Sequence, residues 1–394
     1  MTGVLSGYRV LDFGRFIAGP YCATLLAEFG ADVIRIEKVA GSEDRYTTPV
    51  NDEELGALFL QINRNKRGLT LNPMKPEGQE IVRKLVETAD VVVANLPPQG
   101  LKALGLDLDS LKKIKPDIIL TTVSVFGHGG PYSDRVGFDG IGQVMSGATY
   151  MSGTEEQPVK FAGPWVDFTT AMMSAIGTLL ALMHRDKTGE GQMVEGALLR
   201  SALTIGNAAI IEQAMLNINR KPSVNRGQTA GPSDIIPTKD GWIIVQVIGK
   251  PLFERWVKLV GKPELLDDPR FADDLKRGDH GEILSEIAKE HAKDKTTEEV
   301  LAEYAAASVP AGPLLSPQQV LENEHVQAMG FLQDVPFPGL DKPAPVASAP
   351  INLSATPGSI RHRAPKLGEH TDEILGGLGY TADQLADLRS KRVI

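Results

Sequence analysis

Short runs of Val, Ile and Leu alternate with amphipathic segments over the first 125 residues of the chain. Such runs predict buried strands, and apolar residues that recur every three or four positions predict helices. The expected strands cover residues 8–13, 32–37, 90–95 and 117–124, and the expected helices cover residues 21–29, 76–89 and 108–114. Strands that alternate with helices are typical of a parallel sheet with Rossmann-like winding. We therefore expect an α/β fold whose ligands bind at the carboxyl ends of the strands.

The pattern changes in the second half of the chain. Residues 138–211 are mostly helical in pattern, with an interruption at residues 187–196. Residues 234–248 predict a β-hairpin that turns at Lys239-Asp240-Gly241, and amphipathic helices follow to about residue 323. The Pro-rich segment 336–357 predicts an extended linker rather than a strand interior. We thus expect a large domain in residues 1–225, a smaller α+β domain in residues 226–325, and a linker and C-terminal part in residues 326–394.

The composition narrows the classes of partner. The net charge of -9 disfavours nucleic acid and anionic membranes as main partners, although a local basic pocket for a phosphorylated ligand remains compatible with it. The single cysteine, Cys22, excludes an intramolecular disulfide and any zinc or iron–sulfur site built from cysteines, and no metal site is expected. No signal-peptide pattern opens the sequence and no apolar run reaches membrane-spanning length, so we expect a cytoplasmic protein.

Asp167 is the most informative single residue. It stands between Val166 and Phe168, just after the Gly163-Pro164 break and before a segment with helical apolar spacing. One interpretation is an N-cap residue without chemistry. The other is a desolvated nucleophile, because a carboxylate in apolar surroundings loses hydration and can attack an activated acyl group.

Each predicted strand also ends in a loop with polar or glycine-rich character. These loops contain Gly14-Arg15, Glu37-Lys38, Asn95 and the segment Phe126-Gly127-His128-Gly129-Gly130-Pro131. Glycines in the last loop allow backbone N–H groups to approach an anion closely, although Gly-Gly-Pro also simply makes a turn. No phosphate-loop pattern and no dinucleotide-type glycine triplet is present, which disfavours nucleotide hydrolysis and hydride transfer.

Several short motifs in a fixed order resemble the family III CoA-transferases. This group includes formyl-CoA:oxalate and carnitine CoA-transferases and the related 2-methylacyl-CoA racemases. The matching segments span nearly the whole chain and are Arg9 to Phe13 with Arg15, Ala18-Gly19-Pro20, Gly30 to Glu37, Asn63 to Gly68, Phe126-Gly127, Gly130-Pro131-Tyr132, Gly137-Phe138-Asp139, Gln143, Ser146-Gly147, Gly191-Gln192, Pro310 to Pro313, and Pro365 with Leu367 to Thr371. Many motifs in the correct order are more specific than any one of them.

The resemblance implies a large Rossmann-like domain formed by both chain ends, a small inserted domain and an interlocked homodimer. It makes Asp167 the catalytic aspartate, which forms an anhydride with the acyl group and then a thioester with CoA. The substrates are an acyl-CoA donor and a carboxylic acid acceptor, and no prosthetic group is implied. The positive end of the helix dipole is expected to help hold Asp167 ionised.

The CoA-binding candidates come from the strand-end loops. Arginine and lysine pair well with phosphate oxygens, although each such side chain is about as easily a solvated surface charge. The full set of candidates is Arg15, Lys38, Asn63, Arg64, Lys66, Arg67, Asn95, Leu96, Pro97, Phe126, Gly127 and His128. Pro97 stands where the family commonly has a basic residue. Candidate donors for an oxyanion are backbone groups near Asp167 or in the glycine-rich loop.

Other activities remain open at this point. The racemases carry a proton-transferring histidine where this chain has Phe138, which disfavours racemization unless His128 takes that role. Only Gly249 remains of a glycine run that formyl-CoA transferases have near residues 247–253, which favours a carboxylate larger than oxalate. A hydrolase or lyase could use the same anhydride, whereas a non-catalytic CoA-binding scaffold would not need Asp167.

Overall fold

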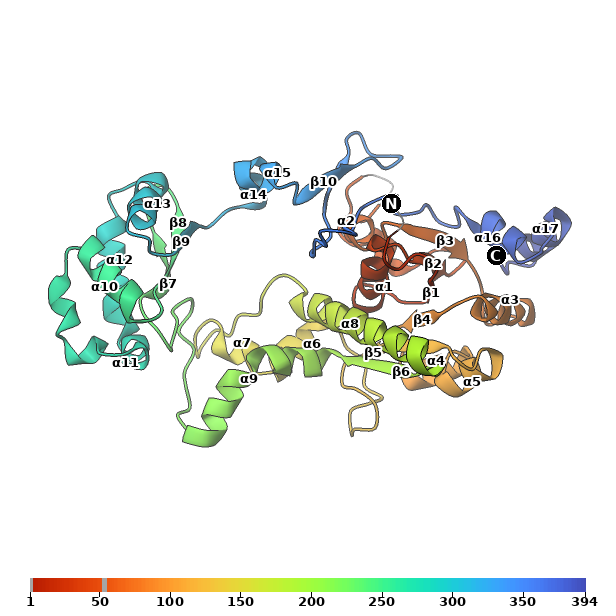
Figure 1. The fold of residues 1–394 in the computed structure, drawn as a ribbon, viewed down its shortest axis with the longest axis horizontal. Coiled ribbons are helices and arrows are strands. Elements are labelled where there is room, and N and C mark those ends of the chain that lie inside the picture. The colour runs from red at the N-terminus through yellow and green to blue at the C-terminus, as the bar shows by residue number, and fades with distance from the viewer. Residues whose placement is uncertain (1–2, 52–54) are drawn as a thin grey trace. The chain divides into compact units, whose positions relative to one another are not determined.

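A computed structural model describes residues 3–51 and 55–394 of the chain. It contains two compact units (Figure 1). The large unit comprises Met1–Ser146, Phe161–Ala208 and Ala328–Ile394, and the small unit comprises Gly147–Lys160 and Ala209–Gln327. Residues 147–160 and 209–225 thus group with the small unit, because contacts such as the ion pair between Lys221 and Glu155 join these two segments.

The large unit is built on a six-stranded sheet whose pairs are all parallel. The strands are β1 (Arg9–Asp12), β2 (Asp32–Glu37), β3 (Lys66–Thr70), β4 (Val91–Ala94), β5 (Ile119–Ser124) and β6 (Met193–Ala197). Their order is β3-β2-β1-β4-β5-β6, which is the doubly wound order with a switch point between β1 and β4. The α/β prediction is therefore confirmed, and ligands of such sheets bind beyond the carboxyl ends of the strands at the switch point.

Alternate residues of the central strands face two separate cores. Leu11, Ile34 and Val92 belong to one buried cluster, whereas Val10, Val33 and Val91 belong to another. Helices cover both faces, which explains why these strands are continuous apolar runs. The helices of the large unit are α1 (Ala18–Glu28), α2 (Ala57–Ile62), α3 (Pro76–Glu87), α4 (Pro98–Ala103), α5 (Leu108–Ile114), α6 (Asp139–Met145), α8 (Trp165–Thr188), α16 (Thr371–Gly377) and α17 (Ala382–Ser390), with the 3₁₀ turn η1 (Glu43–Tyr46). The helix α9 (Leu198–Leu216) continues from the large unit into the small one.

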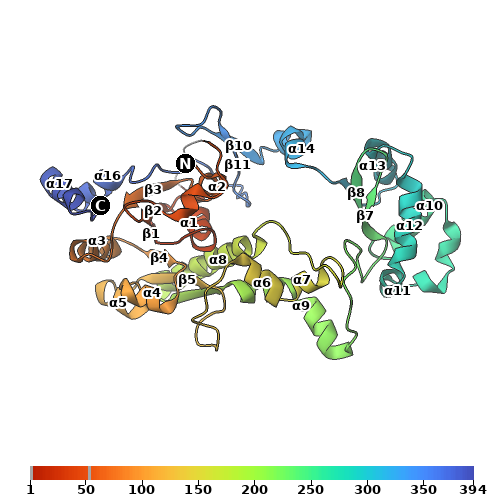
Figure 2. The ribbon, with the colours of Figure 1, turned by 180° about the vertical axis from the view of Figure 1, so that it is seen from behind.

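The C-terminal segment belongs to the large unit. Figures 1 and 2 show α16 and α17 close to α3. Leu385 and Leu388 of α17 share a buried cluster with Ile81 and Leu85 of α3, and the Lys84 ammonium lies 4.3 Å from the centroid of the Tyr380 ring. Both ends of the chain therefore build the large unit.

The small unit contains a three-stranded antiparallel sheet of β7 (Ser233–Pro237), β8 (Trp242–Gln246) and β9 (Ala311–Pro313). The predicted hairpin corresponds to β7 and β8 and is confirmed. Its core includes Trp256, whose indole N–H donates to the Tyr304 hydroxyl at 3.2 Å. The helices are α7 (Ala148–Met151), α10 (Lys250–Leu259), α11 (Asp274–Asp279), α12 (Gly281–Ala292), α13 (Thr297–Ala306) and α14 (Pro317–Glu322), with the 3₁₀ turns η2 (Pro263–Leu266) and η3 (Pro269–Phe271), and α15 (Glu324–Ala328) closes the segment.

One expectation about an irregular segment is wrong. The Pro-rich segment is not only a linker, because β11 (Ala344–Ala347) pairs antiparallel with β10 (Leu332–Val335). Pro345 is tolerated there because a two-stranded sheet has only edge strands. The interruption expected at residues 187–196 contains most of β6, a strand at the sheet edge that lacks a continuous apolar run and whose first four residues are only partly buried or exposed.

Among the described residues, α8 alone is long and apolar enough to cross a membrane, and 44% of its apolar window is buried. The buried side of α8 packs on α1, β5 and β6. A core helix of a soluble protein has the same length and composition, so this feature is weak evidence for a membrane span. The cytoplasmic location stays a prediction.

Candidate active site

Asp167 lies in the first turn of α8 and is not the cap of this helix. Pro164 occupies the N-cap position and makes no side-chain cap bond. The cap is supplied by Asp139 of α6, whose Oδ2 accepts hydrogen bonds from the backbone N–H groups of Val166 at 2.8 Å and Asp167 at 3.0 Å. The N-cap interpretation of Asp167 is therefore wrong, and its carboxylate is available for chemistry.

Asp139 is itself buried and held in place. Its side chain accepts a hydrogen bond from the Gln143 amide, and the Gln143 oxygen accepts from the backbone N–H of Phe161 at 3.0 Å. The helices α6 and α8 approach closely at Gly142, where an added Cβ would lie 2.8 Å from a methyl group of Val166. A glycine is thus required for Asp139 to reach the start of α8.

The electrostatic environment raises the pKa of Asp167 to about 7. Burial is the larger cause and the negative charge of Asp139 is the second. No side chain or backbone group of the described residues donates a hydrogen bond to the Asp167 carboxylate. The expectation that the helix dipole holds Asp167 ionised is wrong, because Asp139 already occupies the N–H groups of the first turn. Asp167 is instead a poorly solvated carboxylate that exchanges its proton near neutral pH.

Asp167 lines a cavity of about 210 Å³ within the large unit. Arg15 follows β1, Asn95 follows β4, and Ser124 ends β5, and all three line the same cavity. The cavity therefore lies at the switch point of the sheet, as expected for the ligand site of this fold. Its remaining walls are largely apolar and are formed by Phe16, Ala18, Pro97, Val123, Val125, Val136, Gly137, Phe138 and Leu198, together with Ser133 and Arg135.

Asn95 fixes the loop that follows β1. Its Oδ1 accepts from the backbone N–H of Arg15 at 2.6 Å, and its Nδ2 donates to the Arg15 carbonyl at 2.7 Å. The Asn95 side chain thus binds both backbone groups of one residue. This arrangement makes Asn95 a positioning residue for the cavity wall.

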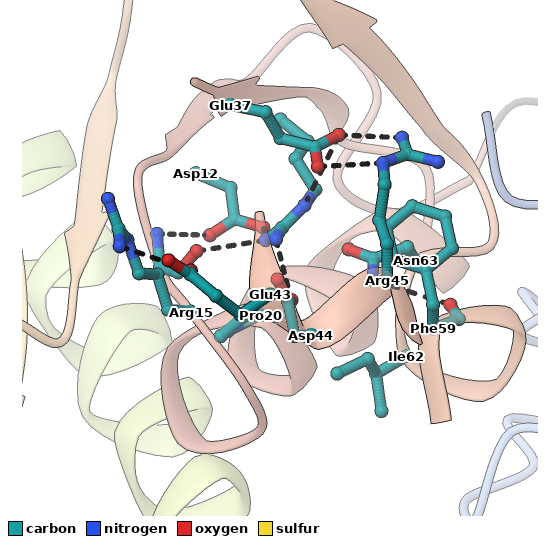
Figure 3. A network of polar contacts seen from close by, with 12 residues as sticks. Asp12, Arg15, Pro20, Glu37, Glu43, Asp44, Arg45, Phe59, Ile62 and Asn63 are labelled. Carbon is teal, nitrogen blue, oxygen red and sulfur yellow. Dashed lines mark hydrogen bonds and ion pairs between the residues drawn. The ribbon is translucent and has the colours of Figure 1, made fainter. Parts of the chain in front are cut away.

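A buried network of ion pairs also supports this loop, through the backbone of Gly14 (Figure 3). Asp12 at the end of β1 pairs with Lys66 at 2.8 Å and with Arg35 at 3.5 Å. Asp12 accepts from the Gly14 N–H at 2.8 Å, and Arg35 donates to the Gly14 carbonyl at 2.9 Å. Burial lowers the pKa of Lys66 to about 8 despite the nearby Asp12. The network therefore links buried charges to the backbone beside Arg15.

The basic residues predicted to bind CoA differ in their exposure and in their partners. Lys38 is exposed and pairs with Glu43 at 2.6 Å, and Arg15 reaches the same carboxylate at 3.4 Å. In contrast, Arg64 is buried, and its Nε donates a hydrogen bond to Glu28 at 2.7 Å. Lys66 is also buried and pairs with Asp12. Arg67 pairs with Asp32 and Glu373, both at 2.7 to 2.8 Å. The charges of Arg64 and Lys66 are thus already paired with buried carboxylates of the protein.

The remaining candidates lie in or against the core of the large unit, or in the loop that follows β5. Asn63 is buried and accepts a hydrogen bond from Lys66 at 3.0 Å, and Leu96 packs against the core of the large unit. The backbone N–H of His128 donates to Glu195 at 3.2 Å, and Gly127 adopts a φ of 83° in the same loop. The Phe126 ring contacts Tyr132. Of the twelve candidates, the structure brings Arg15, Asn95 and Pro97 to the cavity of Asp167.

The candidate set omitted Asp139 and most of the residues that line the cavity, among them Phe16, Phe138 and Arg135. Phe16 and Phe138 contact each other edge to face, with centroids 5.4 Å apart. Phe16 has a φ of 56°, which is uncommon for a bulky residue and marks a constrained loop. For Phe138 and Asp139, the sequence did contain a signal, because the segment Gly137-Phe138-Asp139 is one of the motifs that match the CoA-transferase family.

Comparisons with known proteins identify the family of this chain. The model of "CoA-transferase family III" matches residues 5–371. The chain is 36% identical to the succinyl-CoA–L-malate CoA-transferase beta subunit of Chloroflexus aurantiacus and 34% identical to the succinyl-CoA–D-citramalate CoA-transferase of the same organism, and each alignment covers 99% of this chain and 98% of the relative.

A solved structure shows the same fold over nearly the full length. The crystal structure of a CAIB/BAIF family protein from Brucella suis has a TM-score of 0.83 and 32% sequence identity, and the match covers 96% of this chain and 100% of that one. Sequence identities above 30% over nearly the full length are higher than those of proteins that share only a fold. The chain therefore belongs to family III of the CoA-transferases and is an enzyme of that family.

Proposed function

We propose that this enzyme transfers CoA from succinyl-CoA to a second carboxylic acid, with Asp167 as the nucleophile. The observation that carries the proposal is the Asp167 carboxylate, which lines the switch-point cavity and has a pKa raised to about 7 by burial. The named relatives support the donor, since both are succinyl-CoA-dependent transferases. The acceptor acid is left open by both observations.

The reaction proceeds through two kinds of covalent intermediate. Ionised Asp167 attacks the thioester carbonyl, which gives an acyl-aspartyl anhydride and releases the CoA thiolate. The thiolate then attacks the aspartyl carbonyl, so that succinate leaves and an aspartyl-CoA thioester remains. The acceptor carboxylate attacks this thioester and expels the thiolate again. Attack of the thiolate on the acceptor carbonyl of the second anhydride yields the new acyl-CoA and restores Asp167.

The environment of Asp167 suits this chemistry. A carboxylate that accepts no hydrogen bond and is largely removed from water is a stronger nucleophile than a solvated one. A pKa near the working pH still leaves a substantial ionised fraction. The backbone N–H groups of Val166 and Asp167 are bound to Asp139, and that of Phe168 is bound to Pro164. Donors for the oxyanion therefore come from elsewhere. The glycine-rich loop expected from the sequence is a poor source, because the N–H groups of Gly127, His128 and Gly130 already donate to Ser124, Glu195 and Ser133.

We assign the phosphates of CoA to Arg15 and Lys38 among the predicted basic residues. These two side chains share Glu43, and their ion pairs are at least partly exposed. Exposed pairs contribute only about 0.2–1 kcal/mol, so a phosphate can replace Glu43 at little cost. Arg64 and Lys66 would have to break buried pairs, which typically costs about 3–5 kcal/mol.

The interlocked homodimer implied by the family resemblance is also part of the proposal. The described surface of α8 exposes an apolar stripe of Met172, Met173, Ile176, Leu179, Leu180 and Met183. A stripe of this kind is typical of a surface that another protein chain covers. A second copy of the chain is the partner that the family resemblance supplies.

Two observations weigh against the racemase alternative. Phe138 lies in the cavity wall at the position of the racemase histidine and cannot carry a proton. His128 does not line the cavity, and its Nδ1 lies 3.7 Å from Glu195. Neither residue thus offers a proton-transfer base beside Asp167.

Mass spectrometry of the Asp167 peptide tests the proposal. The enzyme is mixed with succinyl-CoA, acetyl-CoA, formyl-CoA or a 2-methylacyl-CoA, quenched rapidly and digested. We expect an acyl or CoA adduct on the peptide that contains Asp167 with succinyl-CoA, and no adduct in the Asp167→Ala variant. Absence of any adduct, together with incorporation of solvent deuterium at the α-carbon of the 2-methylacyl-CoA, would replace the transferase assignment with a racemase.

A further inference from the structure

Two arginines line the cavity of Asp167, the partly exposed Arg15 and the exposed Arg135, and their side chains have different partners. Arg15 is paired with Glu43 at 3.4 Å, and its backbone is bound by Asn95. For Arg135, by contrast, no carboxylate of the described residues lies within 4.0 Å of the guanidinium. The cavity wall therefore contains a cation whose charge the described part of the chain leaves uncompensated.

Arg135 is nevertheless held in a defined position. Its guanidinium carbon lies 3.7 Å from the centroid of the Tyr132 ring, and its backbone N–H donates to the Tyr132 carbonyl at 2.9 Å. The Tyr132 ring in turn contacts the Phe126 ring, with centroids 5.5 Å apart and an angle of 73°. Contact with an aromatic face leaves the N–H donors at the edge of a guanidinium free, and these donors match the two oxygens of a carboxylate.

We propose that Arg135 binds the distal carboxylate of a dicarboxylic acyl group and thereby selects diacids over monocarboxylic acids. This inference rests on the proposed transferase function, because it places the substrate carbonyl at Asp167. Both residues line the same cavity of about 210 Å³. The succinyl group is short. Within one small cavity, a single succinyl group therefore places its distal carboxylate at Arg135 and its thioester carbonyl at Asp167.

A phosphate of CoA is the other anion that a guanidinium could bind. The phosphates of CoA are separated from the sulfur by the whole pantetheine chain, whereas the distal carboxylate of succinyl-CoA is separated from the thioester carbonyl by two methylene groups. The shared cavity of Arg135 and Asp167 therefore favours the carboxylate. Apolar walls at Phe16 and Phe138 fit the methylene groups between the two ends of the diacid.

Selectivity between two donors tests this assignment. Succinyl-CoA and butyryl-CoA have acyl chains of the same carbon number but differ in the distal carboxylate. The rate of Asp167 acylation is measured for each donor in the wild type, Arg135→Gln and Arg135→Lys. Hydrogen bonds to charged groups predict that Arg135→Gln lowers the ratio of succinyl-CoA to butyryl-CoA rates by roughly 10- to 100-fold, with a smaller loss in Arg135→Lys. The exposed cation Lys113 on α5 supplies a matched control, and Lys113→Gln should leave the ratio unchanged.

The outcomes separate this inference from the proposed function. If Arg135→Gln slows both donors by the same factor and weakens inhibition by free CoA, Arg135 binds a phosphate and the inference is wrong. Equal rates with both donors in the wild type would also overturn it, while leaving transferase chemistry intact. If the wild type acylates Asp167 with neither donor, the proposed function fails and the inference fails with it. Thermal melting of each variant shows whether a lost rate reflects unfolding.

Discussion

Replacement of Asp167 by asparagine is expected to stabilise the folded protein at neutral and alkaline pH. The Asp167 carboxylate is largely buried, accepts no hydrogen bond from the described residues and lies near Asp139. Its pKa is raised from 3.8 to about 7 in the folded state. Because the folded state holds this proton more tightly than the unfolded state, stability falls as the pH rises between these two values. Asparagine has nearly the same shape and carries no charge, so it removes this penalty.

The size of the effect follows from the pKa. Each pH unit between the unfolded and folded values corresponds to about 1.4 kcal/mol, which gives a full penalty of roughly 4 kcal/mol above pH 7. At about pH 5 the penalty is only roughly 1.5 kcal/mol, since the folded carboxyl is then mostly protonated. The gain from Asp167→Asn should therefore grow by roughly 2.5 kcal/mol between about pH 5 and about pH 8.

Urea denaturation of the wild type and Asp167→Asn at several pH values measures this gain. Both proteins must be compared at the same concentration, because dimerization would make apparent stability depend on concentration. Asp109→Asn is a matched control, since Asp109 is an exposed carboxylate in the first turn of α5. This control should show a change of no more than about 1 kcal/mol, as expected for an exposed charge at a helix N-terminus. A gain that does not depend on pH, or no gain at pH 8, would refute a desolvated Asp167.

Two further predictions concern activity. The value of kcat/KM for succinyl-CoA should rise with pH around a midpoint near 7, because the protonated Asp167 carboxyl cannot attack, and Asp139→Asn should move this midpoint to lower pH. A midpoint that stays in place in Asp139→Asn would contradict the electrostatic role of Asp139. Loss of both hydrogen bonds to the Arg15 backbone in Asn95→Ala should lower kcat by roughly 10- to 100-fold in steady-state assays. Unchanged kcat in this variant would show that the loop after β1 does not need Asn95.

The regular elements of the large unit could be predicted because their signals are local. The strand at 32–37 and the helix at 108–114 agree with β2 and α5 to the residue. In each case the apolar spacing of consecutive residues already contains the period of the element. The edge strand β6 lacks such a run, since it gains its place from backbone pairing with β5 rather than from burial of its side chains.

The roles of the charged residues could not be predicted in the same way. Arg64 and Lys66 have the composition of a phosphate site in the sequence, yet each lies against a buried carboxylate that is far away along the chain. Glu28 and Asp12 become their partners only when β1, α1 and β3 come together. The position of a basic residue along the chain therefore does not show whether its charge is paired with a ligand, with a carboxylate of the protein or with solvent.

The sequence by itself determined the parallel α/β fold, the two-part character of the chain and Asp167 as the residue to test. The tertiary structure decided that Asp139 caps α8, that Asp167 is poorly solvated as a result of burial, and that Arg15, Asn95 and Arg135 share its cavity. The physical reason is that periodicity along the chain reports which side chains are buried. The pKa of a buried group, by contrast, depends on the distance to charges and donors on other elements, and only folding sets those distances.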